Sequence, residues 1–186
     1  MSDWEEIGET ELILAAQAGR TDAFGELYTR YAACVFRFIF AHLDNRLDAE
    51  DLTEEVFLRA WRALPQFRQQ GFPFSAFLFR ISRNALVDLY RQSAGKKTEV
   101  SISEVYTEPD PCLQPAEVVS LRFEHRELQQ ALGNLREEYR TVLALRFFSG
   151  LTPTEIARVM KRSVGAVRVL QYRALSALRL LIDKNG

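Results

Sequence analysis

The spacing of apolar residues along the chain predicts a protein built from helices. Over residues 21–43 apolar side chains recur every three or four positions, which is the period of one helix face, and they are Phe24, Leu27, Tyr31, Cys34 or Val35, and Phe38. The same reasoning predicts helices over 10–17, from Asp48 to about Leu64, and from Ser75 to about Gln92. We take Thr21 as a helix cap, and Pro65 and Gly71-Phe72-Pro73 as breaks. No sustained strand alternation or internal repeat is present, so we expect an all-α fold.

Residues 151–179, LTPTEIARVMKRSVGAVRVLQYRALSALR, predict a helix-turn-helix. Thr152 is a natural N-cap, Pro153 suits the first helical position, and Glu155 can complete a capping box. The first helix ends at Lys161-Arg162, and Ser163 caps the second. Helices from Pro115 to about Leu132 and from Arg136 to Phe148 precede this motif, with Gly133 and Gly150 as stops.

The second helix of this motif has a basic face. From Ile156 to Ile182 there are six Arg or Lys residues and no acid. Small Gly165 and Ala166 in its first turn would let the backbone approach a DNA groove, as recognition helices do. The alternative is an ordinary helical hairpin whose basic face is only solvated.

The prolines divide the chain. Three of the six lie at 109, 111 and 115, in KKTEVSISEVYTEPDPCLQP, which has no sustained helical period and five acids between Thr98 and Ser120. We therefore predict two small helical domains, over 10–95 and 123–183, joined by a flexible acidic linker over 96–122.

Composition narrows the class of protein. No run reaches the roughly 18 to 20 apolar residues of a membrane span, and the acidic start lacks signal-peptide features, so we expect a cytoplasmic protein without membrane insertion. Cys34, Cys112, His42 and His125 have neither disulfide nor metal-ligand spacing. With no nucleotide-binding fingerprint or catalytic constellation either, we expect no enzyme, no cofactor and no metal.

Charge is segregated although the net charge is only −1. Residues 1–60 carry 13 acids against 5 bases and 98–124 carry 6 against 1, whereas 61–97 carry 1 against 7 and 125–186 carry 5 against 11. Two basic blocks of net +6 suggest two contacts with one polyanion, and the acidic blocks should face something else.

The sequence DAEDLTEEVFLRAW, residues 48–61, predicts a protein contact beside the DNA contacts. On a helix, Asp51, Glu54 and Glu55 share one exposed face, while Leu52 and Val56 point to a core. Such a face repels phosphate. The alternative is that this face is exposed to solvent and contacts no partner.

Aromatic and basic residues meet in the next segment. Five phenylalanines lie between Phe67 and Phe79, and Arg80, Arg83, Asn84 and Arg91 follow. Aromatic rings beside arginines suit unpaired bases, which offer a face for stacking and a phosphate for pairing. For any single ring, packing inside the core is an equal alternative.

Taken together, these segments resemble the sigma-70 family of bacterial RNA polymerase initiation factors, in particular the small extracytoplasmic-function (ECF) group. The resemblance covers about Leu12 to Arg91 and Glu127 to Leu181, with these motifs in order: FGELYTRYAACVFRF, DAEDLTEEVFLRAW, FSAFLFRISRNALVDLYR, LREEYRTVLALRFFSGLTPTEIA and SVGAVRVLQYRAL. It implies core RNA polymerase, promoter DNA and an anti-sigma factor as partners. It also implies that the linker threads toward the active-site cleft of the polymerase.

The resemblance assigns three sets of site residues. The β′ clamp coiled coil would be bound by Asp51, Glu54, Glu55, Arg59 and Trp61. The −10 element would be opened and read by Phe72, Phe74, Arg80, Arg83, Asn84, Asp88 and Arg91. The −35 element would be read by Arg162, Ser163, Gly165, Ala166, Arg168, Tyr172 and Arg173, and the helices before them would grip the β-flap tip.

The chain departs from the usual ECF pattern at a few positions. Phe77 replaces a frequent Trp and Glu54 a frequent Gln, both conservatively. Leu170-Gln171 replaces a common Arg-Leu pair, which removes a cation and weakens the transfer of individual −35 contacts. No long extension follows Leu181, so we expect no further regulatory domain.

Two other classes of protein fit parts of the chain. An autonomous helix-turn-helix regulator would explain residues 125–186 but not the acidic face or the Phe-Arg segment. A helical adaptor would explain the acidic face but not the basic helices.

Overall fold

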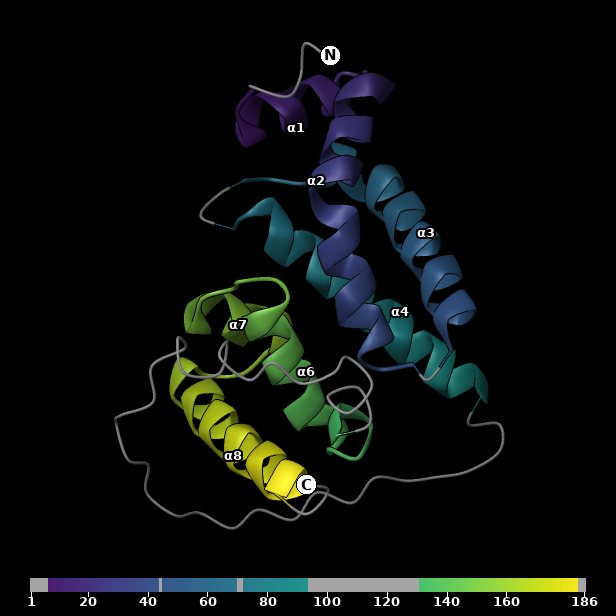
Figure 1. The fold of residues 1–186 in the computed structure, drawn as a ribbon. Coiled ribbons are helices and arrows are strands. Elements are labelled where there is room, and N and C mark those ends of the chain that lie inside the picture. The colour runs from purple at the N-terminus through teal and green to yellow at the C-terminus, as the bar shows by residue number, and fades with distance from the viewer. Residues whose placement is uncertain (1–6, 44, 70–71, 94–130, 184–186) are drawn as a thin grey trace.

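A computed structural model describes residues 7–43, 45–69, 72–93 and 131–183, and within these ranges the fold is all-α, without a strand (Figure 1). This confirms the predicted fold class. The elements are α1 (Glu9–Gln17), α2 (Thr21–Phe40), α3 (Arg46–Ala63), the 3₁₀ turn η1 (Leu64–Gln66), α4 (Phe74–Ser93), α6 (Glu137–Phe147), α7 (Pro153–Met160) and α8 (Val164–Asp183). The predicted linker, Cys112, His125 and most of the helix expected over 115–132 lie outside the described residues.

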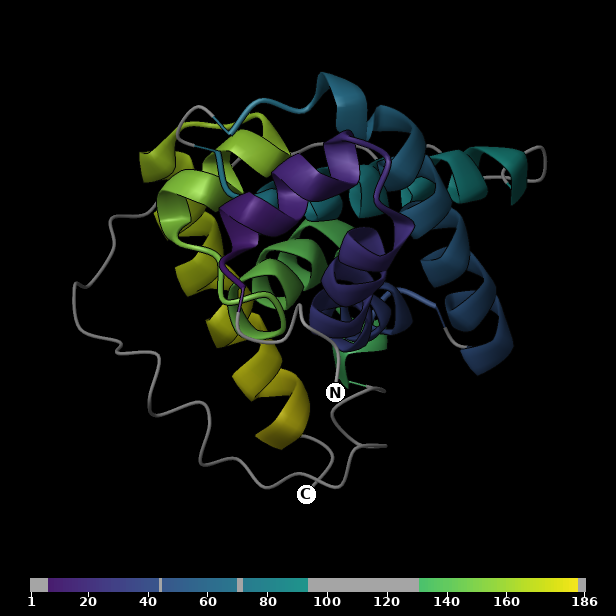
Figure 2. The same cartoon turned by 90° about the horizontal axis from the view of Figure 1, so that it is seen from above.

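The N-terminal module consists of α1 to α4. Helices α2, α3 and α4 pack against one another, and α1 crosses the end of α2 (Figures 1 and 2). The largest fully buried side chains of this module include Phe38, Phe74, Phe79, Leu27 and Val56.

The N-caps of α2 and α3 differ from the sequence prediction. Helix α2 is capped by Arg20 rather than Thr21, without a side-chain bond. Helix α3 begins two residues before Asp48, because the Asn45 side chain accepts a hydrogen bond from the Leu47 backbone N–H and satisfies a free donor of the first turn.

The C-terminal module contains the predicted helix-turn-helix. Glu155 accepts from the Thr152 backbone N–H at 2.7 Å, and the Thr152 hydroxyl accepts from the Glu155 N–H at 3.3 Å, so the capping box is formed. Lys161 ends α7 in the left-handed conformation, with φ of 55°. The Ser163 hydroxyl then accepts from the Ala166 N–H at 3.2 Å and starts α8.

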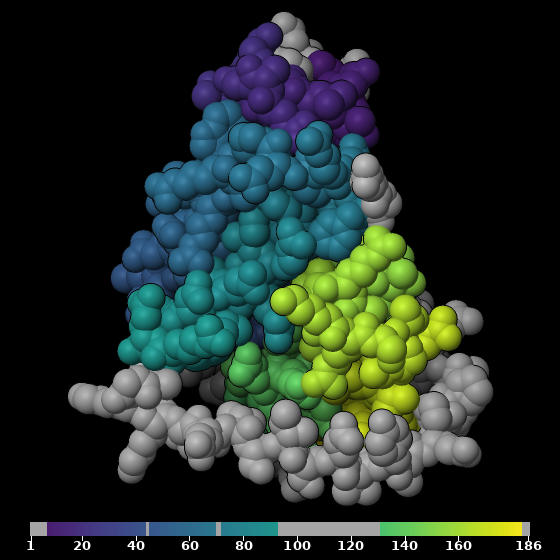
Figure 3. Space-filling model, turned by 180° about the vertical axis from the view of Figure 1, so that it is seen from behind, coloured from purple at the N-terminus to yellow at the C-terminus, as the bar shows by residue number. Residues whose placement is uncertain are grey.

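The two modules pack together. Helix α7 lies against α4, and α6 lies against the end of α2 (Figures 1 and 3). His42, just after α2, is 5% exposed, and its Nε2 lies 2.9 Å from the hydroxyl of Thr141 on α6. The His42 carbonyl accepts from Tyr90 of α4 at 2.7 Å. One residue therefore joins three helices of both modules.

Candidate functional site

The acidic face predicted on α3 lies on the surface. Asp51 and Glu54 are exposed, and Glu55 is partly exposed, while Val56 is fully buried on the opposite side. Arg59 donates from Nε to Glu55 and from Nη1 to Asp88 of α4, both at 2.8 Å. The hydrogen bonds to Glu55 and Asp88 raise the pKa of the Arg59 guanidinium, which stays charged. A residue predicted to bind protein and one predicted to face DNA thus share one ion-pair network.

An open pocket of about 490 Å³ lies beside this face, between α2 and α3. Glu54 and Trp61, two of the predicted site residues, line it. The rest of its lining was not predicted as a site and comprises Thr21, Phe24, Gly25, Tyr28, Phe57 and Leu58.

The pocket residues are held by ring contacts. The rings of Phe24 and Trp61 have centroids 4.8 Å apart, and those of Tyr28 and Phe57 lie 4.7 Å apart. Tyr28 is 41% exposed and Leu58 is 52% exposed. Large apolar side chains outside the buried stripe of each helix are the sequence signal that could have identified this surface.

The phenylalanine cluster is mostly core. Phe67, Phe74, Phe77 and Phe79 are all buried, with exposures of 0–7%. Phe74 packs its ring against Phe67, Phe77 and Tyr31, with centroids 5.6–5.8 Å apart. The structure therefore places Phe74, predicted as a ring for stacking on a base, inside the core, because the first turn of α4 directs it toward α2.

Phe72 is the remaining ring of the cluster and is partly exposed. The guanidinium of exposed Arg80 lies over the Phe72 ring, 5.6 Å from its centroid, and over Phe77 at 5.9 Å. This cation–π contact puts a positive charge beside an accessible ring. Along the same helix Asn84 and Arg91 are exposed, while Arg83 and Asp88 are partly buried.

The predicted −35 residues lie around the start of α8. Gly165, Arg168 and Tyr172 are exposed, and Ala166 and Arg173 are partly exposed. Ser163 acts as the cap, and Arg162 forms an ion pair with Glu138 of α6. Leu170 is buried, so it belongs to the core-facing side of α8. The side-chain nitrogen of neighbouring Gln171 is buried and has no hydrogen-bond partner among the described residues.

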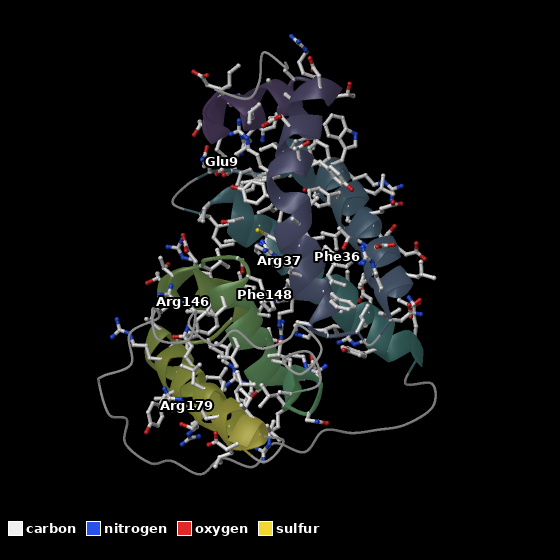
Figure 4. All side chains as sticks on the ribbon, in the orientation of Figure 1. Glu9, Phe36, Arg37, Arg146, Phe148 and Arg179 are labelled. Atoms are coloured by element: carbon white, nitrogen blue, oxygen red, sulfur yellow. The ribbon has the colours of Figure 1, made fainter. Side chains whose placement is uncertain are left out.

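Of the residues considered as metal or disulfide candidates, Cys34 and His42 lie in the described ranges and have other contacts. The described ranges contain no group of three or more His, Cys, Asp or Glu side chains that could hold a metal ion. Cys34 accepts a hydrogen bond from Arg37 at 3.2 Å. Figure 4 shows Arg37 on α2 facing the C-terminal module that carries Phe148.

Within the described residues, no helix combines the length and apolar character needed to cross a membrane.

Comparison with known proteins identifies the families and relatives that the chain matches. Residues 27–95 match the model of Sigma-70 region 2, and residues 125–178 match that of Sigma-70 region 4. The ECF RNA polymerase sigma factor ShbA of Streptomyces griseus is 34% identical over 180 residues, covering 93% of this chain and 94% of ShbA.

Two further proteins are similar. The ECF RNA polymerase sigma factor BldN of Streptomyces coelicolor is 39% identical over 174 residues, and the match spans 93% of this chain but only 66% of BldN. A structure of CnrH in complex with the cytosolic domain of CnrY has a TM-score of 0.67 and 29% identity, covering 95% of this chain and 97% of CnrH.

Proposed function

The chain belongs to the sigma-70 family of RNA polymerase factors, in its ECF group, and we propose which of its surfaces binds the polymerase and which contact promoter DNA. The chain is a promoter-specificity factor of RNA polymerase, and an autonomous regulator is not favoured. We assign it a non-catalytic, cytoplasmic role in which the polymerase supplies the chemistry.

We propose that α3 binds the β′ clamp coiled coil through Asp51, Glu54, Glu55, Arg59 and Trp61. The exposed carboxylates and the adjoining apolar pocket support this assignment, since a basic and apolar helical partner would fit both. Tyr28 and Leu58 join the proposed surface because they are exposed at the same pocket.

The segment from Phe72 through α4 would open and read the −10 element. Phe72 beneath Arg80 offers a ring for a base and a cation for its phosphate, and exposed Asn84 and Arg91 extend the surface. Asp88 would act here through its ion pair with Arg59 and not by touching DNA, because a carboxylate repels phosphate.

The start of α8 would read the −35 element in the major groove. Exposed Gly165 and Arg168, with Ala166 beside them, support this assignment, as do Tyr172 and Arg173 one turn further along. The domain ranges 10–95 and 123–183 then correspond to the two DNA contacts. Because CnrH has been solved with the cytosolic domain of CnrY, we also propose an anti-sigma factor as a partner.

The observation that carries this proposal is the Arg59 network, which joins an acidic protein-binding face to the helix of a basic, aromatic DNA surface. Run-off transcription with core polymerase tests it. We expect promoter-dependent transcripts only when the chain is added, and poor binding of promoter duplex by the chain alone. Tight, sequence-specific binding by the isolated chain at physiological salt, without transcripts, would instead indicate an autonomous regulator.

A further inference from the structure

Helix α1 lies outside the segment that matches Sigma-70 region 2, which begins at residue 27. It nevertheless contacts η1, the turn that follows α3 (Figures 1 and 2). Its last residue bonds to Leu64 and Phe67, and its first residue bonds to Tyr31, whose ring packs on Phe74. Neither contact involves the acidic face of α3.

Gln17, the last residue of α1, bonds to η1 and to the residue that follows it. Its side-chain Nε2 donates to the Leu64 carbonyl at 2.9 Å and to the Phe67 carbonyl at 2.8 Å. A side-chain amide has two N–H donors, so both are used on these backbone acceptors. The Leu64 carbonyl also accepts from the Phe67 backbone N–H at 3.0 Å, whereas Gln17 reaches the two carbonyls from 47 and 50 residues away in the chain.

The bond to Phe67 holds a residue of the buried phenylalanine cluster. The Phe67 ring packs on Phe77 of α4, with centroids 4.7 Å apart, and on Phe74 at 5.8 Å. Phe77 in turn lies beneath Arg80, the residue that also covers Phe72. A shift of the Phe67 backbone would therefore be transmitted to the surface formed by Phe72 and Arg80.

The other end of α1 acts through Tyr31 of α2. Glu9, labelled in Figure 4, accepts a hydrogen bond from the hydroxyl of Tyr31 on α2. The Tyr31 ring meets Phe74, the first residue of α4, edge-on with centroids 5.6 Å apart. Helix α1 thus contacts Phe67 directly and Phe74 through Tyr31.

We propose that Gln17 is a positioning residue for promoter opening: by holding the Leu64 and Phe67 carbonyls, it fixes Phe67 and, through Phe77, the surface of Phe72 and Arg80 that is proposed to meet the −10 strand. This inference rests on the proposed role of Phe72 and Arg80. It assigns α1 a part in strand opening although α1 carries none of the residues proposed to contact DNA or the polymerase.

The test compares Gln17→Ala, Gln17→Glu and Gln17→Lys in the full chain with core polymerase. Alanine and glutamate cannot donate to the carbonyls, whereas lysine can. Gln66→Glu is the matched control, since Gln66 is exposed on the neighbouring turn. The measurements are polymerase capture, the rate of open-complex formation on duplex promoter, the same rate on a promoter premelted at the −10 element, and thermal unfolding.

We expect Gln17→Ala and Gln17→Glu to slow opening of duplex promoter roughly tenfold, the factor expected for one or two net hydrogen bonds. Premelted promoter should restore the wild-type rate, capture should not change, and Gln17→Lys and Gln66→Glu should behave as wild type. Unchanged opening of the duplex would overturn the inference. So would equal losses on both templates, loss of capture, or failure of Gln17→Lys to rescue. If wild-type chain itself yields no transcripts, the proposed function fails before the variants are compared.

Discussion

Nη1 of Arg59 lies 2.8 Å from Oδ2 of Asp88, and this ion pair joins α3 to α4. The two side chains are 35% and 44% exposed, so solvent screening limits what the pair contributes to stability. Its importance is geometric, because it fixes the helix of the proposed polymerase-binding face relative to the helix proposed to open DNA.

Arg59→Ala and Asp88→Asn should each slow open-complex formation, and the double variant should be no slower than the worse single variant. Two residues that act through one contact give non-additive effects. The free energy of unfolding should fall by no more than about 1 kcal/mol in Asp88→Asn. A double variant whose defect equals the sum of the two would show that Asp88 acts independently of Arg59.

Reversing the acidic face with Asp51→Lys and Glu55→Lys should abolish capture of core polymerase. Helicity should persist, since exposed substitutions usually change stability by about 0.5 kcal/mol. Glu11→Lys, an exposed charge reversal on α1, serves as the control. Wild-type affinity of the double variant for core polymerase in a pull-down titration would mean that this face is only solvated.

Phe72→Ala should impair promoter opening, whereas Phe74→Ala should destabilise the fold. Loss of the partly exposed Phe72 ring should remove about 1 to 3 kcal/mol of stacking on a base, and premelted promoter should largely restore opening. Loss of the fully buried Phe74 should lower the free energy of unfolding by about 3 to 5 kcal/mol. Denaturant melts and opening rates measured on both templates separate the two. The same early melting for Phe72→Ala would place that ring in the core as well.

Arg168→Ala should cost about 1 to 3 kcal/mol of promoter binding and relax preference at one or two −35 positions. Arg168 is exposed in the second turn of α8, nearer the end that would enter the groove. Arg173 lies five residues further on, about 140° around the helix, so it cannot face the same base edge. Arg173→Ala should weaken binding to all promoters alike. Binding affinities for every single-base change in the −35 element check this prediction. An unchanged base preference in both variants would mean that α8 does not read bases.

Acid should weaken the packing of the two modules through His42. Because Nδ1 lies 2.8 Å from the Phe38 carbonyl, the neutral ring donates there, and Nε2 accepts from the Thr141 hydroxyl. Burial, together with the charges of Arg140 and Arg83, lowers the pKa of His42 to about 4.

The folded state therefore binds fewer protons at His42 than the unfolded chain, whose His titrates near 6.5. Stability from this residue is complete above pH 6.5 and falls by about 1.4 kcal/mol per unit as the pH drops toward 4. Urea unfolding at several pH values measures the slope. In His42→Gln the slope between these limits should be smaller than in wild type; an equal slope would assign the acid sensitivity to other groups.

Sequence patterns correctly predicted the features that depend on residues close together in the chain. The capping box of Thr152 and Glu155, the cap at Ser163 and the apolar periods of α2 and α8 depend on residues within one or two helical turns. The sequence could not show that His42 meets Thr141, 99 residues away, or that Gln17 reaches Leu64 and Phe67.

The phenylalanine segment shows a different limit of sequence reasoning. Composition indicated that rings and arginines lie together, but which ring reaches the surface depends on how α4 is rotated against α2. That rotation buries Phe74, whereas Phe72, which lies before α4, is partly exposed.

The ion pair between Arg162 and Glu138 has a consequence for how DNA binding responds to salt. A cation that neutralises a phosphate normally releases a counterion from the duplex, and each such contact steepens the salt dependence by about 0.9 in log-log slope. Arg162 is already paired with the Glu138 carboxylate of its own chain. When Arg162 contacts a phosphate instead, the phosphate replaces Glu138 as its partner. The freed Glu138 carboxylate then takes up a cation from solution. The uptake at Glu138 offsets part of the release from the duplex. Titrations of the holoenzyme against salt will therefore count fewer phosphate contacts at this end of α8 than its arginines suggest.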